Sequence, residues 1–431
     1  MEDLETLGAD RRPVKTVIVG QGYVGLPVAM RAVAVGHDVV GYDVDEARTC
    51  MLARGRSFIE DVSDVDVRAA IDTGRFTPTN DHRRCAGFDN LVITVPTPLR
   101  DGTPDLSYVE SATATIARYL RPGAVVMLES TTYPGTTNEL VGPILHELTG
   151  LVAGVDYALG YSPERIDPGN AVWTLSNTPK VVSGVNADSL ERVDAFYRQL
   201  VTTTVPVSST KVAELTKLIE NTFRHVNIAL ANELAVFAAD LDIDIWEAIE
   251  AASSKPYGFM PFTPGPGVGG HCLPIDPSYL SWKVRRSLGR TFRFVELAND
   301  VNEHMPDYVV DRLLRLLNVQ GVALSRSTIL VLGLAYKRNS SDPRESPAIA
   351  IVQKLLEMGA AVHVADPHVV EERFVPEGAT WVEVTEEEVR AADAVVVATD
   401  HDAFPYDVIA TNSKLVFDTR ARMEGPNVAR L

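Results

Sequence analysis

The chain has 431 residues, of which 45% are hydrophobic and 23% are charged, the composition of a globular protein with about three domains. Its formal net charge of −18 argues against a nucleic-acid-binding protein, which normally presents a basic face. The three cysteines are too few for a disulfide framework and favour the cytoplasm. The acidic N-terminus lacks the apolar core of a signal peptide, and no apolar run is long enough to span a membrane.

The first elements predict a dinucleotide site. A buried strand at 14–19 leads into Gly20, Gly22 and Gly25, then a helix, and then a second strand at 38–42 that ends at Asp43. Glycines permit the tight turn and the approach of a pyrophosphate, and an acid about 20 residues later binds ribose hydroxyls. Asp43 would repel a 2′-phosphate, so the cofactor is predicted to be NAD rather than NADP. The predicted cofactor contacts also include Tyr23, Val24 and Arg48.

The next strands, at 90–95 and 124–128, run into loops rich in Thr, Pro and Gly. Ligands of an open parallel sheet lie against such loops, so Thr97 and Thr131 are expected either to line the crevice or only to cap the turns. Further along, Glu164 lies in a loop bracketed by prolines, where it is either a catalytic carboxylate or a solvated surface group.

A long helix is predicted from about Ser209 to Asp240. Lys217 and Asn221 are four residues apart and share a face, which makes them a candidate carbonyl or oxyanion clamp. The alternative is that Lys217 only extends to solvent past an apolar core stripe. That stripe consists of Val212, Leu215, Ile219, Phe223 and Val226. A helix of this length is typical of the connector in a bilobed enzyme.

The loop at 265–277 has the strongest chemical signal in the chain. Four glycines precede Cys272, and Asp276 follows four residues later. A lone cysteine is more often an inert buried residue. A glycine loop that presents a thiol beside a carboxylate, however, suits nucleophilic attack by a thiolate on an electrophilic carbon. No metal site is predicted.

The strand–helix pattern then restarts with strands at 328–332, 361–365 and 394–399 and a helix at 347–358. The glycine triplet is absent, so this lobe is expected to hold a different ligand. Lys337, Arg344 and Arg420 are candidate phosphate binders, although each alone could be a surface charge. Ser346 before Pro347 could be only a helix cap.

Several blocks, in order, resemble the nucleotide-sugar dehydrogenase family over nearly the whole chain: GQGYVGLP, VPTP, ESTTYPGTT, YSPERIDPGN, KLIENTFRHVNIALANEL, GPGVGGHCLPIDP and GLAYKRNSSDPRESPA. The resemblance implies an α/β fold of two Rossmann-like, doubly wound parallel-sheet domains joined by a long-helix central domain. The implied boundaries are 1–207 for the NAD domain, 208–318 for the central domain and 319–431 for the UDP-sugar domain. It also implies a homodimer through the central helix, or a higher assembly.

The resemblance further implies an NAD-dependent oxidation of a UDP-sugar at C6, taking the alcohol to the acid in two hydride transfers. Cys272 would capture the aldehyde as a thiohemiacetal, and Asp276 would be its acid–base partner. Lys217 and Asn221 would stabilise the oxyanion, Thr131 would be the active-site threonine, and Glu164 would assist thioester hydrolysis. Lys337 and Arg420 would bind the uridine nucleotide, and Arg344 would reach NAD.

The residues of these blocks resemble the N-acetylhexosamine branch of the family more closely, so UDP-GlcNAc is the expected substrate. UDP-glucose and UDP-ManNAc are the alternatives, and a non-catalytic nucleotide-sugar sensor is a remote one. Arg165 and Tyr257 are the predicted contacts to the acetamido group, and the backbones of Gly267 and Gly269 are expected to approach the substrate. Family members commonly place a partner-subunit Arg shortly before the glycine loop. This chain has Lys255 and Pro256 there, so that contact is unassigned.

Asp43 generates a prediction about the cofactor. Because its carboxylate would repel the 2′-phosphate of NADP⁺, we expect kcat/KM to be much higher with NAD⁺. Steady-state assays with the two cofactors measure this preference, and comparable kcat/KM values would contradict it.

Overall fold

The computed structural model describes residues 13–431 except 101, 168–169, 171, 271–272 and 370–371. The chain forms two compact units, Met1–Ile219 and Glu220–Leu431, and each is described by itself. The unit boundary falls within the 31-residue helix α7 (Thr210–Asp240).

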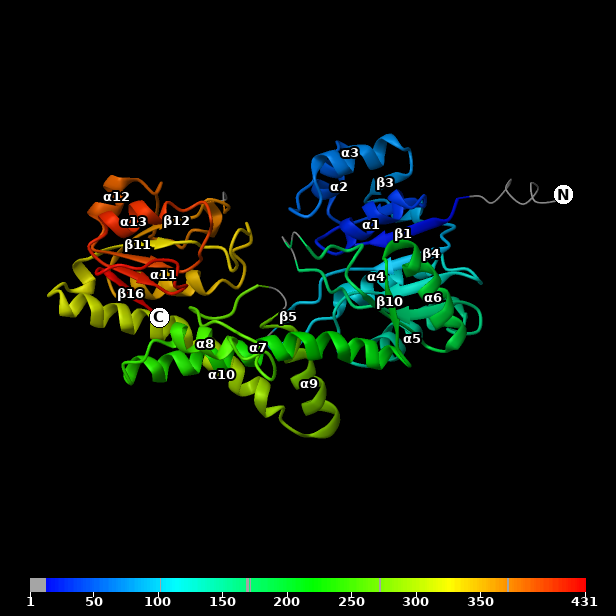
Figure 1. The fold of residues 1–431 in the computed structure, drawn as a ribbon. Helices are drawn as coiled ribbons and strands as arrows, with labels where there is room; N and C mark the ends of the chain where they lie inside the picture. The colour runs from blue at the N-terminus through cyan, green and yellow to red at the C-terminus, as the bar shows by residue number, and fades with distance from the viewer. Residues whose placement is uncertain (1–12, 101, 168–169, 171, 271–272, 370–371) are drawn as a thin grey trace, which may run out of the picture. The chain divides into compact units, whose positions relative to one another are not determined.

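The first unit, coloured from blue to green in Figure 1, contains an eight-stranded sheet in the order β10-β9-β8-β7-β4-β1-β2-β3. The strands are β1 (Lys15–Val19), β2 (Asp38–Tyr42), β3 (Phe76–Thr79), β4 (Asn90–Ile93), β7 (Val125–Leu128), β8 (Ala158–Tyr161), β9 (Lys180–Gly184) and β10 (Thr204–Pro206). Every pair is parallel except β8 and β9, which run antiparallel with Gly160 opposite Gly184. Ligands of such sheets bind where the strand order reverses, here between β1 and β4.

Helices cover this sheet because its strands are apolar on both faces, as parallel strands require. The helices are α1 (Gly25–Ala34), α2 (Glu46–Ala53), α3 (Asp64–Asp72), α4 (Ser107–Ala117), α5 (Gly142–Thr149) and α6 (Ala187–Leu200). A short hairpin, β5 (Leu99–Arg100) with β6 (Thr103–Pro104), follows β4, and a π-helical turn, Thr137–Val141, precedes α5. One core cluster joins Ile18, Val92 and Met127 of the strands to Leu26 of α1 and Phe196 of α6.

The second unit begins with the rest of α7 and continues with α8 (Ile245–Ser253), α9 (Asp276–Leu288) and α10 (Arg293–Val319). Its six-stranded parallel sheet has the order β13-β12-β11-β14-β15-β16. The strands are β11 (Thr328–Leu332), β12 (Ala361–Ala365), β13 (Thr380–Trp381), β14 (Ala394–Val397), β15 (Val416–Asp418) and β16 (Val428–Arg430). The order β3-β2-β1-β4-β7-β8 of the first sheet corresponds to the complete order of the second.

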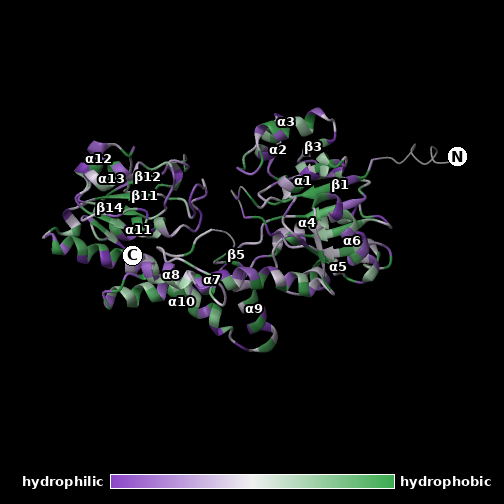
Figure 2. Cartoon of the chain, viewed as in Figure 1, coloured by the Kyte–Doolittle hydropathy of each residue, from purple (hydrophilic) through white to green (hydrophobic). Residues whose placement is uncertain are grey.

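Both faces of the second sheet are buried. Ile329 and Val331 of β11 face a cluster that includes Leu313 of α10 and Ile351 of α11 (Pro347–Glu357). Leu330 and Leu332 face the opposite cluster, which contains residues of α12 (Glu386–Ala391) and α13 (Tyr406–Asn412). The strands at the centre of each unit are accordingly coloured as hydrophobic in Figure 2, whereas the covering helices carry both colours.

The structure confirms the predicted fold class, apart from the antiparallel β8–β9 pair. It also confirms the long helix, which begins at Thr210, and the cap of α11, where the Ser346 side chain accepts from the Ala348 N–H ahead of a first-turn proline. No helix among the described residues is long and apolar enough to cross a membrane.

The interpretation of the α7 stripe as part of the core was wrong. Val212, Ile219 and Phe223 are exposed by 42%, 56% and 47%, whereas Lys217 and Asn221 on the same helix are buried. A helix buries its apolar face only where another element covers it, and this face is covered only in part, for example where the Phe262 ring lies 5.7 Å from that of Phe223.

Asp366, which follows β12, ties the turns of the second sheet together. One carboxylate oxygen accepts from the N–H groups of Leu334 and Ala335, at 2.7 and 2.9 Å, and from His401 Nε2 at 3.0 Å. The other accepts from His368 and Val369. Burial opposes ionisation, but His401 and the backbone donors outweigh it and lower the pKa of Asp366 to about 2.

Asp366→Asn should therefore destabilise the second unit. An amide cannot accept from all of these donors, and the unsatisfied buried groups should cost about 2–4 kcal/mol at pH 7. Denaturant-dependent hydrogen exchange of β11 and β12 measures the loss, with the exposed Asp311→Asn of α10 as the matched control. Because the folded pKa is lowered, the wild-type advantage is present above about pH 4 and should shrink as the pH falls toward 2. A deficit no larger than that of Asp311→Asn would contradict this account.

Candidate active site

The glycine turn after β1 is shaped for a dinucleotide. A Cβ on Gly25 would lie 1.8 Å from the Gly20 carbonyl oxygen, and Gly20 has a φ of +93°, so both positions require glycine. Gly22, in contrast, has no other atom within 4 Å of where its Cβ would lie. Open space at the N-terminus of α1 fits a pyrophosphate, which the helix N–H groups and dipole stabilise. Tyr23 and Val24 complete the turn, and Tyr23 is 38% exposed.

Asp43 lies at the end of β2, beside this turn. Its Oδ2 accepts from the Gln21 N–H at 2.8 Å, and its Oδ1 accepts from the Asp45 N–H at 2.9 Å. Arg48 of α2 lies 3.9 Å from Asp43 Oδ2 and is half exposed. A carboxylate held by backbone donors keeps its remaining lone pairs for ribose hydroxyls, so these residues fit NAD.

The two predicted threonines follow neighbouring strands and are partly buried, Thr97 after β4 and Thr131 after β7. The Thr131 loop is anchored by Glu214 of α7, a fully buried carboxylate. Glu214 accepts from the N–H groups of Gly135 and Thr137, at 2.5 and 2.9 Å, and from the Thr137 hydroxyl at 2.7 Å. Burial raises the pKa of Glu214, although these donors oppose the rise. The anchor fixes the loop against the helix that carries Lys217.

Glu164, at the end of β8, is part of a buried ion cluster. Lys180 of β9 places its ammonium 3.1 Å from Glu164 Oε2 and 3.0 Å from Oε1 of Glu129, which follows β7. Glu164 Oε1 also accepts from the N–H groups of Arg165 and Ile166, at 2.7 Å each. Burial opposes ionisation of Glu164, but Lys180 and the Ile166 N–H outweigh it and lower the pKa of Glu164. The sequence interpretation of a solvated surface carboxylate is therefore wrong.

Lys217 is likewise buried, with 9% of its surface exposed. Its positive charge is close enough to Glu164 to contribute to the lowered pKa of that carboxyl. The alternative that Lys217 simply extends to solvent is therefore wrong as well.

In the second unit, Asn221 and Asp276 are in contact. The Asn221 side-chain amide donates to Asp276 Oδ2 at 2.5 Å, and both residues are at most 5% exposed. Asp276 is the first residue of α9, four residues after Cys272 in the sequence. Cys272 itself lies outside the described residues.

A chain of buried amides holds the start of the glycine loop. The Asn232 side chain of α7 accepts from the Gly265 N–H at 2.9 Å and donates to Asn302 of α10 at 2.9 Å. Asn302 is bonded in turn to His225, whose Nε2 pairs with Asn299 at 2.7 Å. Burial lowers the pKa of His225, which favours the neutral ring.

The loop glycines are packed too closely for side chains. A Cβ at Gly267 would lie 3.1 Å from the Asn302 carbonyl oxygen, and one at Gly269 would lie 2.5 Å from that of Glu345. Both would also meet Pro347, the first residue of α11. These two glycines therefore pack against protein in the described structure, and their predicted approach to substrate stays a prediction.

Arg420, which follows β15, is partly buried beside this loop, and a Cβ at Gly265 would lie 2.5 Å from its Nη1. Its Nε donates to the Ala398 carbonyl at 3.0 Å. Within the described part of the chain Arg420 forms no ion pair. Burial lowers the pKa of its guanidinium, although Asp400 and Asp418 oppose the change. A partly buried cation of this kind suits an anionic ligand.

The remaining predicted residues have other surroundings. Lys337 is partly exposed in the loop after β11. Arg344 is exposed and makes a bidentate pair with Asp342, at 2.7 and 2.6 Å. Arg165 donates to the Pro179 carbonyl at 2.7 Å. Tyr257 is 73% exposed, with Lys255 Nζ 5.1 Å from its ring centroid.

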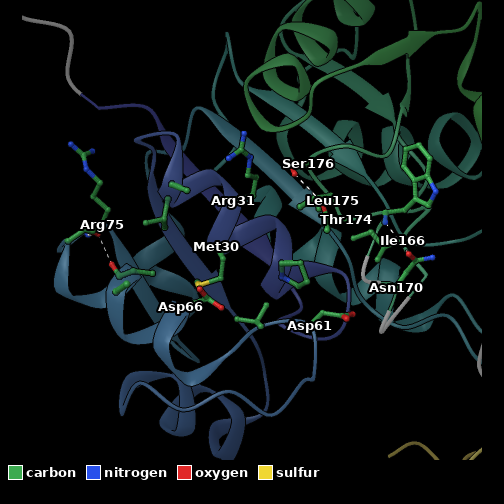
Figure 3. A pocket seen from close by; sticks show the side chains of 18 of the residues that line it. Met30, Arg31, Asp61, Asp66, Arg75, Ile166, Asn170, Thr174, Leu175 and Ser176 are labelled. Carbon is green, nitrogen blue, oxygen red and sulfur yellow. Dashed lines mark hydrogen bonds between the residues drawn. The ribbon is translucent and has the colours of Figure 1, made fainter. Parts of the chain in front are cut away.

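A separate cavity of about 840 Å³ lies in the first unit between α1, α3 and the segment that follows Glu164 (Figure 3). Met30 and Arg31 of α1, Asp66 of α3, and Ile166 and Leu175 are among its lining residues. None of the predicted site residues that the structure describes lines it, and Arg31 is already bonded to the Leu200 carbonyl.

Sequence reasoning missed Lys180, Glu129, Glu214 and the amide chain. A charged residue directly before two valines, at the start of a strand, was the available signal for Lys180, since such a residue is buried only when paired. For Asn232 and His225 the signal was polar residues on the buried face of a long helix.

The chain matches three models of the UDP-glucose/GDP-mannose dehydrogenase family: the NAD binding domain over residues 14–201, the central domain over 211–304 and the UDP binding domain over 330–424. It is 36% identical to UDP-N-acetyl-D-mannosamine dehydrogenase of Pyrococcus horikoshii, over 91% of this chain and 90% of that protein. It is also 36% identical to UDP-N-acetyl-D-glucosamine 6-dehydrogenase of Pseudomonas aeruginosa, over 91% of this chain and 92% of that protein.

Among solved structures, UDP-D-ManNAc dehydrogenase from P. horikoshii aligns with a TM-score of 0.88 at 34% identity, covering 97% of this chain and 99% of that one. The matched ranges include the glycine turn of the first unit and, in the second unit, strands β12 to β15 and Arg420. The chain therefore belongs to the UDP-glucose/GDP-mannose dehydrogenase family and is an NAD-dependent nucleotide-sugar dehydrogenase.

Proposed function

We propose that this enzyme oxidises the C6 hydroxyl of a UDP-N-acetylhexosamine, with UDP-GlcNAc preferred, to the uronic acid through a covalent intermediate on Cys272. The observation that carries the proposal is the contact between Asn221 and Asp276. Both are buried polar residues, and Asp276 follows Cys272 by four residues in the sequence. A carboxylate that is near a thiol in the sequence and is held by an amide suits general acid–base catalysis on a substrate bound covalently to that thiol.

Bound NAD would accept one hydride from C6 in each of two oxidation steps. The chain's own groups would do the rest. Asp276 would take the hydroxyl proton through a water, and the ammonium of Lys217 with the amide of Asn221 would stabilise the developing alkoxide. Thr131 would complete the site on the first unit. A preorganised cation is worth most where negative charge develops in the transition state.

Cys272 would keep the aldehyde bound between the two oxidations. Its thiolate would attack the aldehyde carbon to give the anion of a thiohemiacetal, and the second of the two oxidations would convert this anion directly to a thioester, with no further proton to remove. Glu164 would take a proton from water as the water oxygen attacks the thioester carbon. The carbon–sulfur bond would then break with its electron pair on sulfur, giving the acid and the free thiolate.

Two of the relatives support an N-acetylhexosamine as the sugar, without distinguishing UDP-GlcNAc from UDP-ManNAc. The two matched proteins are named for UDP-N-acetyl-D-mannosamine and UDP-N-acetyl-D-glucosamine, so an N-acetylhexosamine is common to both. We propose that Arg420 and Lys337 hold the diphosphate of the substrate and that Arg165 and Tyr257 meet the acetamido group. Arg344 is proposed to contact NAD.

We also propose a homodimer through α7, which the exposed apolar face of this helix supports. Within the second unit, Phe223, Leu230, Leu234, Phe237 and Leu241 are exposed by 45–69% and recur at helical spacing. A continuous apolar face on a folded chain marks an interaction surface.

The first prediction from this proposal concerns the substrate preference. With a panel of UDP-sugars, we expect UDP-GlcNAc or its 2-epimer to give a kcat/KM roughly 10- to 100-fold above that of UDP-glucose. The plain 2-hydroxyl of glucose would leave unpaired the enzyme's hydrogen-bond donor to the acetyl carbonyl.

Two NADH should form per sugar oxidised, and Cys272→Ala should make no acid. Equal or better turnover of UDP-glucose would move the chain to the glucose branch. Acid made by Cys272→Ala at two NADH per sugar would rule out the covalent route.

The second concerns the anion site. Arg420→Met should raise the Kd for UDP by roughly 10- to 100-fold, since a charge-assisted hydrogen bond is worth about 1.5–3 kcal/mol. Titration calorimetry with UDP alone measures it without catalysis. Arg390→Met on α12, whose charge is paired with Glu386, is the control and should leave binding unchanged. An unchanged Kd in Arg420→Met would remove this residue from the nucleotide site.

A further inference from the structure

The buried cluster around Lys180 contains one more carboxylate than neutralisation of its ammonium requires. Lys180 lies between Glu129 and Glu164 and is 3% exposed. Glu164 alone would balance the charge of Lys180, although the buried Lys217 adds a second positive charge near Glu164. Glu129 is 1% exposed, and its second oxygen, Oε2, has no hydrogen-bond partner among the described residues. A second buried carboxylate is costly unless it has a role beyond charge balance.

The surroundings of Glu164 suggest that role. Without Glu129, the Glu164 carboxylate would have two backbone N–H donors and the undivided charge of Lys180. Such an anion is firmly ionised but a weak base, because each stabilising contact reduces its affinity for a proton. A general base works best when its proton affinity is matched to the operating pH.

We propose that Glu129 and Lys180 are positioning residues that act through Glu164: the Lys180 ammonium keeps the Glu164 carboxylate ionised and oriented, and Glu129 competes for that ammonium and so preserves the basicity of Glu164. This inference rests on the proposed role of Glu164 as the base that activates water. Tyr197 of α6 donates to Glu129 Oε1 at 2.6 Å and lies beneath the ammonium, 5.3 Å from ring centroid to Nζ. Glu129 Oε1 is therefore shared between the Tyr197 hydroxyl and the Lys180 ammonium.

The described titratable groups that face the cluster act on its charges in opposite directions. Burial raises the pKa of Glu129 despite Lys180 and Tyr197. Burial opposes the charge of Lys180, but Glu129 and Glu164 outweigh it and raise its pKa. The groups concerned are Glu129 after β7, Arg165 beside Glu164, Lys180 on β9, Tyr197 on α6 and Lys217 on α7. Glu129 and Glu164 share the Lys180 ammonium, so a change in one carboxylate must alter the proton affinity of the other.

The test compares four proteins: wild type, Glu129→Gln, Lys180→Met and the double variant. Glu129→Gln leaves the ammonium to Glu164 and should lower its proton affinity. Lys180→Met removes the cation and should raise the proton affinity of Glu164, so that its titration midpoint moves up by about one pH unit or more. The double variant should lie between wild type and Lys180→Met, because it loses the repelling carboxylate together with the cation.

Two measurements report this order. In ligand-free protein labelled with carbon-13 at the Glu side-chain carboxyl, NMR follows the Glu164 signal with pH, and Glu164→Gln identifies that signal. In the working enzyme, the acid limb of the kcat profile for acid formation should shift to lower pH in Glu129→Gln and to higher pH in Lys180→Met. A purely structural role would lower thermal stability in each variant without opposite shifts.

The outcomes are distinguishable. An unchanged Glu164 titration in Glu129→Gln and the double variant would overturn the inference, even if Lys180→Met fails to fold. Failure of wild type to produce any acid from UDP-sugars would overturn the proposed function, while the ordered NMR titration would still support the coupling. Opposite shifts in both measurements would support both.

Discussion

The direction of the parallel strands is the constraint on which the candidate site depends. Parallel strands end at the same edge of a sheet, so residues that follow them are gathered there although they are distant in sequence. In the first unit this edge brings together the glycine turn after β1, Asp43 after β2 and Thr131 after β7. The antiparallel β9 adds Lys180 from its first residue, next to the end of β8 that carries Glu164. Lys180 can lie between Glu129 and Glu164 only because β9 runs in this direction.

The second sheet repeats the same strand order with a different ligand chemistry. Gly333 occupies the place of Gly20, and its N–H donates to Ala365 as that of Gly20 does to Tyr42. Asp366 occupies the place of Asp43, but its two oxygens are used by four backbone N–H groups and His401. A carboxylate whose oxygens already accept these hydrogen bonds has little capacity left to bind ribose hydroxyls. The same backbone architecture therefore has a structural aspartate here, and we propose that Arg420 binds the ligand instead.

The sequence was sufficient where the signal is local. The glycine turn, the strands around it, the span of α7 and the Ser346 cap follow from periodicity and from residue types that tolerate few conformations. The pairing of Asn221 with Asp276 joins residues 55 positions apart and has no such signal, although each residue was singled out by itself.

The errors have a common physical origin, because burial depends on what packs against a residue. Lys217 and Glu164 are typical surface residue types, yet both are buried, and the apolar side of α7 is exposed. The Lys180 cluster joins residues from β7, β8, β9 and α6 that no spacing rule connects. The Asn232–Asn302 contact similarly joins α7 to α10 across 70 residues. Long-range polar contacts of this kind are decided by tertiary structure.

The central claim is that the sugar becomes covalently attached to Cys272 between oxidation and release. The most direct measurement is the mass of Glu164→Gln enzyme quenched in acid after incubation with UDP-GlcNAc and NAD⁺, followed by peptide mapping. The account predicts an acyl adduct of the UDP-sugar on the peptide that contains Cys272, formed with two NADH per active site, because hydrolysis is slowed after the second oxidation. Two NADH with free acid and no adduct on that peptide at any quench time would contradict it.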